Sequence, residues 1–123
     1  MEYLLRTALA PPVEEVLTAA GSDLHVPALC DVEVAAGLRR AMLRGEIDED
    51  RTLQAVEDYL DLPLSRHGHQ RLIGRILDLR DNFSVYDATY VALAERSGGA
   101  LLTGDERLAR ATRTHTGLAT LPQ

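Results

Sequence analysis

The sequence predicts a single α/β domain over residues 1–123, with a small, mostly parallel sheet flanked by helices. Short apolar stretches alternate with longer amphipathic ones along the whole chain, which is typical of strands connected by helices. With 123 residues and 46% hydrophobic content, the chain suits one buried core and is short for two domains. No repeat, low-complexity tract or linker rich in Pro, Gly or Ser divides it.

Proline, glycine and capping residues mark the elements of the first half. Pro12 can open a helix, because its fixed φ suits the first turn, and Gly21 ends that helix. Gly45 ends the next long helix, and Asp48 is placed to cap the one that follows. Pro63 confines a short strand to a sheet edge, since proline donates no ladder hydrogen bond. We therefore expect helices at residues 2–9, 12–20, 29–43 and 49–59, and strands at 24–26 and 62–65.

Apolar spacing defines the elements of the second half. Residues 69–79 carry an apolar stripe at helical spacing, and residues 85–96 are apolar nearly all round, which predicts a helix packed on more than one side. Residues 100–103 form a short continuous apolar run, as in strands inside parallel sheets. A short helix at 106–112 and a last strand at 118–121 complete the predicted domain.

Three carboxylates lie within or beside apolar sequence, namely Glu33, Asp87 and Asp105. Burying an ionised carboxylate costs several kcal/mol unless a positive group compensates it, and these segments offer no basic neighbour. A hard divalent cation such as Mg²⁺ or Mn²⁺ is the natural partner. Because the carboxyl ends of parallel strands meet at one edge, Asp105 after the strand at 100–103 and Glu33 after the strand at 24–26 can face one crevice.

Each of these acids also has a structural interpretation. Ser84 and Asp87 match a capping box, and Asp105 can cap the helix that begins at residue 106. Glu33 is harder to explain in this way, because it lies past the first turn and has no basic residue three or four positions away. The three acids together favour a site for phosphodiester chemistry over three separate caps.

The composition excludes several classes of function. All thirteen basic residues are Arg, so the absence of Lys argues against a P-loop nucleotide site, a Schiff-base enzyme and a phospho-aspartyl receiver or phosphatase-like domain. The net charge of −6 argues against a general nucleic-acid coat protein. The one cysteine, Cys30, cannot form an internal disulfide, and no secretion signal or membrane span is evident, so we expect a cytoplasmic protein.

Three segments, at residues 27–33, 79–94 and 101–108, resemble the PIN-domain ribonuclease toxins of VapC type. Their most specific parts are Tyr86-Asp87-Ala88 and Leu102-Thr103-Gly104-Asp105. The resemblance implies a Mg²⁺- or Mn²⁺-dependent endoribonuclease that acts as the toxin of a type II toxin–antitoxin system and is inhibited by a VapB-type antitoxin. It also implies that Glu33, Asp87 and Asp105 are the metal-binding acids, and that Thr103 lines the site. Apolar helices in so small a domain lead us to expect a homodimer.

The sequence departs from that family at its start. Chains of the family begin with a strand that ends in a metal-binding Asp, whereas this sequence starts at the helix that follows, around Glu2. A start codon assigned downstream of the true one would explain the difference. We therefore expect this chain to bind Mg²⁺ weakly and to cleave RNA slowly or not at all. The alternative function is a truncated, catalytically impaired PIN domain that still binds its antitoxin.

Arg39, Arg40 and Arg107 lie close in sequence to the predicted acids, and we expect them to bind RNA phosphates. The alternative for each is a solvated helix face, which is where most exposed charges lie. His67 and His69 are two residues apart and have no nearby third ligand in the sequence, which argues against a transition-metal site.

Overall fold

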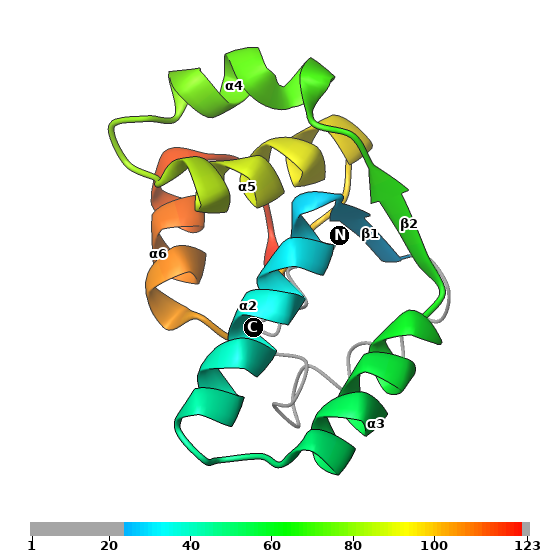
Figure 1. Ribbon diagram of the computed structural model, residues 1–123. Helices are drawn as coiled ribbons and strands as arrows, with labels where there is room; N and C mark the ends of the chain where they lie inside the picture. The colour runs from blue at the N-terminus through cyan, green and yellow to red at the C-terminus, as the bar shows by residue number, and fades with distance from the viewer. Residues whose placement is uncertain (1–23, 122–123) are drawn as a thin grey trace.

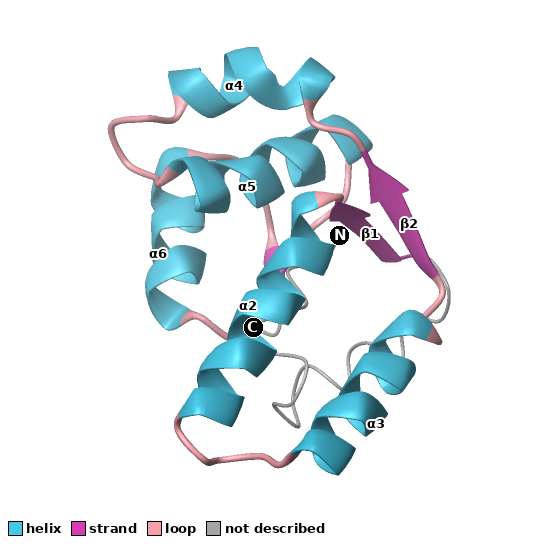
Figure 2. Cartoon of the chain, in the orientation of Figure 1, coloured by secondary structure: helices cyan, strands magenta, loops and turns pink. Residues whose placement is uncertain are grey.

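The computed structural model describes residues 24–121 (Figure 1). The helices predicted at 2–9 and 12–20 lie outside the described residues. In chain order the elements are β1 (Leu24–Pro27), α2 (Leu29–Leu43), α3 (Glu49–Leu60), β2 (Leu64–His67), the 3₁₀ helix η1 (Gln70–Leu72), α4 (Ile73–Asp78), α5 (Val85–Ser97), β3 (Leu101–Leu102), α6 (Glu106–His115) and β4 (Thr120–Leu121). Helices make up most of the described chain (Figure 2).

The described strands pair in parallel, as the sequence predicts. β1 pairs with β2 in a register that runs from Leu24 opposite Leu64 to Pro27 opposite His67. β3 pairs with β4 through Leu101, whose N–H donates to the Ala119 carbonyl at 3.0 Å. Within residues 24–121 these pairs form two separate two-stranded sheets. The α/β class is confirmed, and the small predicted sheet is found as two pairs.

Local chemistry explains where several helices begin and end. The Asp48 carboxylate accepts from the Arg51 N–H at 2.8 Å and so caps α3 as predicted. Ser84 caps α5 in the same way. Gly98 ends α5 at φ +70°, in the left-handed region where a side chain would be strained. Helix α2 has the predicted bounds, Leu29–Leu43.

The bounds of several predicted elements differ from the structure; β3 and β4, for example, are shorter than the strands predicted at 100–103 and 118–121. The single helix predicted at 69–79 is found as η1 followed by α4, because the Leu72 N–H bonds the His69 carbonyl at 2.9 Å in a tight turn. The strand predicted at 62–65 lies two residues later. The Leu64 N–H bonds the Leu62 carbonyl at 2.8 Å, so the chain turns around Pro63 before it pairs with β1.

Helix α5 lies at the centre of the described core. Every residue from Asp87 to Ala94 is buried, and α5 packs against β1, β3, α4 and η1. Val26, Leu101 and Leu102 belong to the same core. This arrangement confirms the prediction of a helix packed on more than one side. No helix within residues 24–121 has both the length and the apolar character needed to cross a lipid bilayer.

Helix α3 is attached largely through a polar cluster at its last turn. Tyr59 is the buried residue of this helix, and its hydroxyl donates to Asp31 Oδ1 at 2.6 Å. The Arg66 Nε donates to both oxygens of Asp31 at 3.0 Å, and its guanidinium lies 5.6 Å from the centre of the Tyr59 ring. The cluster therefore joins α2, α3 and β2.

Cys30 lies beneath this region with no exposed surface. Burial raises the pKa of its thiol, so the side chain is a core residue with little thiolate at neutral pH. This agrees with the sequence interpretation of a free cysteine that packs in the core.

Candidate functional site

Asp87 lies in the first turn of α5 and is only 6% exposed. Its backbone N–H donates to the Ser84 hydroxyl at 3.1 Å, which confirms Ser84 as the cap. This bond involves only the backbone of Asp87, so it does not explain why the Asp87 side chain is buried. A carboxylate is favourable at this end of a helix, because the backbone N–H groups there carry partial positive charge.

Asp105 and Thr103 lie where β3 ends and α6 begins. Asp105 Oδ1 accepts from the N–H groups of Arg107 and Leu108 at 3.0 and 3.1 Å, so the predicted capping role is confirmed. The Asp105 N–H donates to Thr103 Oγ1 at 3.0 Å, and Thr103 is 4% exposed. The Thr103 hydroxyl thus fixes the backbone of Asp105, and the cap orients one carboxylate oxygen.

Glu33 extends from α2 to α5. Its Oε1 accepts a hydrogen bond of 2.6 Å from the hydroxyl of Tyr90, which is 2% exposed. Tyr90 lies three residues after Asp87, so the two side chains share a face of α5. The bond therefore holds Glu33 beside the helix that carries Asp87.

Sequence reasoning assigned no role to Tyr90. The signal that could have identified it is a phenol within Thr89-Tyr90-Val91-Ala92-Leu93, the apolar middle of a helix predicted to be packed on more than one side. Such a hydroxyl needs a partner when buried. Burial, above all, raises the pKa of Tyr90, so the phenol keeps its proton and donates at neutral pH.

The Tyr90→Phe variant is expected to lower the free energy of unfolding by about 1.5–3 kcal/mol, because it leaves the half-buried Glu33 carboxylate without this donor. The matched control is Tyr86→Phe, since Tyr86 is 58% exposed on the same helix. We expect this control to change stability by less than about 0.5 kcal/mol. Urea unfolding at pH 7, followed by circular dichroism, measures both variants. Equal stabilities would show that the bond to Glu33 contributes nothing.

The donor types at these positions suit a hard cation, since carboxylate and hydroxyl oxygens are the ligands that Mg²⁺ prefers. Within residues 24–121, however, no three Asp, Glu, His or Cys side chains come together closely enough to hold one metal ion. Glu33 Oε1 is engaged by Tyr90, and Asp105 Oδ1 is engaged by the N–H groups that it caps. The metal-binding role of Glu33, Asp87 and Asp105 stays a prediction.

The three predicted RNA-binding arginines are all exposed. Arg39 and Arg40 lie in the second half of α2, and Arg40 follows Glu33 by two helical turns, so these two share a face. Arg107 lies in the first turn of α6, beside Asp105. Among the described residues none of the three side chains has an ion-pair partner, which leaves their charges available to a ligand.

The histidines of β1 and β2 make contacts that the sequence did not indicate. His25 Nδ1 lies 2.8 Å from His67 Nε2, and the two rings are tilted by 33°. His69 Nε2 accepts from the Leu29 N–H at 3.0 Å and so meets the start of α2. His67 and His69 therefore contact different groups.

This chain is similar to known proteins in both sequence and fold. Residues 2–113 match the PIN domain family. Ribonuclease VapC9 of Mycobacterium tuberculosis is 38% identical over 104 residues, which cover 85% of this chain and 82% of the relative. Ribonuclease VapC12 of the same organism is 37% identical over 110 residues, which cover 89% of this chain and 84% of the relative. The crystal structure of PAE2754 from Pyrobaculum aerophilum is similar with a TM-score of 0.61 and 21% identity, over 90% of this chain and 78% of that one.

Proposed function

This chain belongs to the PIN-domain family and is of VapC type, and on that premise we propose that it is a Mg²⁺- or Mn²⁺-dependent endoribonuclease, the toxin of a type II toxin–antitoxin pair. Relatives that are named ribonucleases match over most of the chain and support the reaction class. The observation that carries the proposal is the buried Asp87, with Glu33 tied to the same helix one turn away. We propose the cytoplasm as its location.

The proposed metal ligands are Asp87, Asp105 and Glu33. Thr103 would position Asp105 by accepting a hydrogen bond from its backbone N–H. A bound Mg²⁺ supplies a Lewis acid and a nucleophilic water for attack on phosphorus. No side-chain nucleophile is needed, and the expected products carry a 5′-phosphate and a 3′-hydroxyl. We propose that metal binding is weak, since Glu33 Oε1 already accepts from Tyr90 and Asp105 Oδ1 from two backbone N–H groups.

Arg39, Arg40 and Arg107 would hold the RNA backbone near these acids. Each is exposed, and a guanidinium binds phosphate oxygens through two parallel hydrogen bonds. Such contacts position the strand but do not read its bases.

The proposed protein partners are a VapB-type antitoxin and a second copy of the chain. Large exposed apolar side chains on α2 and α3 support an antitoxin surface, among them Val32, Leu43 and Leu53 at 66, 70 and 62% exposure. Ile73 and Leu77 on α4 support a homodimer surface, since they lie with the start of α5 around an apolar groove of about 270 Å³.

Cleavage of a structured RNA pool by the purified chain tests the proposed reaction. Cleavage with Mg²⁺ or Mn²⁺ is expected to be slow, to stop on addition of EDTA, and to be absent from the Asp87→Asn variant. Cleavage that survives either change would contradict the proposed metal site. Folded protein that binds a VapB-type antitoxin but leaves RNA intact would instead establish the impaired PIN domain as the function.

A further inference from the structure

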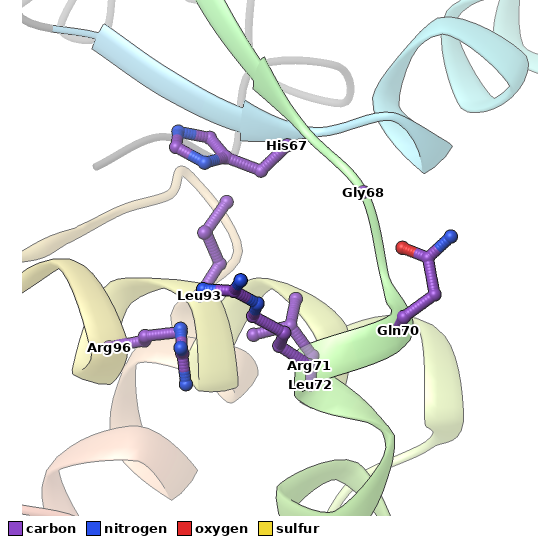
Figure 3. Close-up of a pocket in the computed structure, with 7 residues that line it drawn as sticks. All are labelled: His67, Gly68, Gln70, Arg71, Leu72, Leu93 and Arg96. Atoms are coloured by element: carbon purple, nitrogen blue, oxygen red, sulfur yellow. The ribbon is translucent and has the colours of Figure 1, made fainter.

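A second site lies at the opposite end of α5 from Asp87. A cavity of about 480 Å³ opens where β2 ends, η1 begins and the last turns of α5 pass (Figure 3). Its lining residues are His67, Gly68, Gln70, Arg71, Leu72, Leu93 and Arg96. Arg96 follows Asp87 by nine residues, or roughly 13 Å along a helix axis, and none of the three predicted acids is among the described residues that line this cavity.

Among the described residues that line it, the cavity presents two positive charges and no negative one. In Figure 3 the side chains of Arg71, from η1, and Arg96, from α5, extend toward one another. Neither guanidinium has an ion pair or hydrogen bond within residues 24–121. Like charges that share a partly enclosed space repel each other unless an anion joins them.

The nearest acid in sequence is already engaged. Glu95 accepts from Arg75 Nε at 2.8 Å and from Arg75 Nη2 at 2.9 Å, so both of its oxygens are bound in a fork. Glu95 is thus paired with Arg75, and adjacent residues on a helix do not face each other, so Glu95 forms no ion pair with Arg96. The arrangement leaves the cavity positive on a chain whose net charge is −6.

The residues that line the cavity indicate which kind of anion it can bind. Two guanidinium forks match the oxygens of a phosphate group. Leu72 and Leu93, each 3% exposed, form the apolar floor of the cavity, and the half-buried His67 ring is an aromatic group against which a base can stack. The contact of His67 Nε2 with His25 Nδ1 at 2.8 Å helps to fix the orientation of that ring. The volume is in the range of small-ligand sites, so a phosphate and its attached nucleoside can enter together.

We propose that this cavity binds a nucleoside monophosphate unit, with the phosphate on Arg71 and Arg96 and the base against Leu93 and His67. The unit can be a free nucleotide or one residue of an RNA strand. Binding of a free nucleotide (the free-nucleotide form of the proposal) does not depend on catalysis. Binding of an RNA residue (the RNA form) rests on the proposed function, and it would add a contact with the substrate away from Asp87.

The test is binding measured in EDTA, so that catalysis plays no part. Calorimetry measures the binding of AMP, CMP, GMP, UMP and inorganic phosphate. Fluorescence anisotropy measures the binding of a fluorescein-labelled single-stranded RNA. The double variant Arg71→Gln/Arg96→Gln is expected to weaken binding at least tenfold. It should also reduce the salt dependence of RNA binding, with the slope of log K against log salt falling by about 0.7 for each lost phosphate contact.

The matched control is Arg51→Gln, an exposed arginine in the first turn of α3, which is expected to leave binding within twofold of the unchanged chain. Nucleotide binding that the double variant weakens supports the free-nucleotide form. RNA binding that the double variant weakens, and that a nucleotide competes away, supports the RNA form. The proposal would be overturned if the unchanged chain bound every probe no more tightly than the double variant does. It would also be overturned if the unchanged chain bound nucleotides no more tightly than inorganic phosphate. Failure to cleave RNA would contradict only the proposed function.

Discussion

Replacing Asp105 with asparagine is expected to reduce RNA cleavage at least about 100-fold while changing the free energy of unfolding by less than about 1 kcal/mol. Loss of an outer partner of a metal site typically costs 10- to 100-fold, so loss of a ligand should cost at least as much. The structural role of Asp105 survives, because asparagine caps helices about as well as aspartate and can accept from the Arg107 and Leu108 N–H groups. The variant separates the two interpretations of this residue.

The matched control is Asp48→Asn, the same exchange at the cap of α3, where the carboxylate also accepts from a backbone N–H. Asp48→Asn should lose no more stability than Asp105→Asn, and it should cleave RNA as fast as the unchanged chain. Single-turnover assays with excess protein and Mn²⁺ measure slow cleavage, and thermal unfolding gives the stabilities. If Asp105→Asn cleaves RNA within threefold of the unchanged chain, Asp105 is a cap and not a metal ligand.

The Leu101→Ala variant is expected to lose about 2–5 kcal/mol of folding free energy. Leu101 has no exposed surface, and it lies in β3 within the core that surrounds α5. Alanine would leave a cavity there, since the backbone is fixed by the pairing of β3 with β4. Because small domains are stable by only about 5–15 kcal/mol, this change alone should shift the urea midpoint strongly.

Leu53→Ala on α3 provides the comparison, because Leu53 is 62% exposed and the substitution removes the same atoms. Its effect should stay within about 0.5 kcal/mol. Urea titrations followed by circular dichroism compare the two variants under one set of conditions. A loss below about 1 kcal/mol for Leu101→Ala would mean that β3 contributes little to the core.

Element positions were predictable wherever a local signal decides them. Asp48 and Ser84 determine helix starts through hydrogen bonds within a few residues, and the structure confirms both. Helix α6 runs to His115 and not to 112, since Thr112 is buried with no exposed surface and tertiary packing overrides its weak helix propensity. Strand β2 moved by two residues because its register depends on β1, some forty positions away.

The candidate site was predictable only in part, for the same reason. Asp87 and Asp105 stand at helix starts that the sequence marks, so their positions followed. The bond between Tyr90 and Glu33 joins residues 57 positions apart, and no sequence spacing encodes it. Arg71 and Arg96 share a cavity only because η1 packs against α5, so their sequence positions do not predict that they lie close together.

The burial of α5 also determines how the molecule opens. A helix enclosed over eight consecutive residues, from Asp87 to Ala94, can expose its amides only when the surrounding core separates. Those amides should exchange for deuterium by global unfolding, at the slowest rates within residues 24–121. Helix α3, which buries only Tyr59, can detach by breaking its cluster with Asp31 and should exchange by local opening. The acid at the start of α5 is thus fixed in the last part of the molecule to unfold, while the apolar face of α3 belongs to a part that opens first.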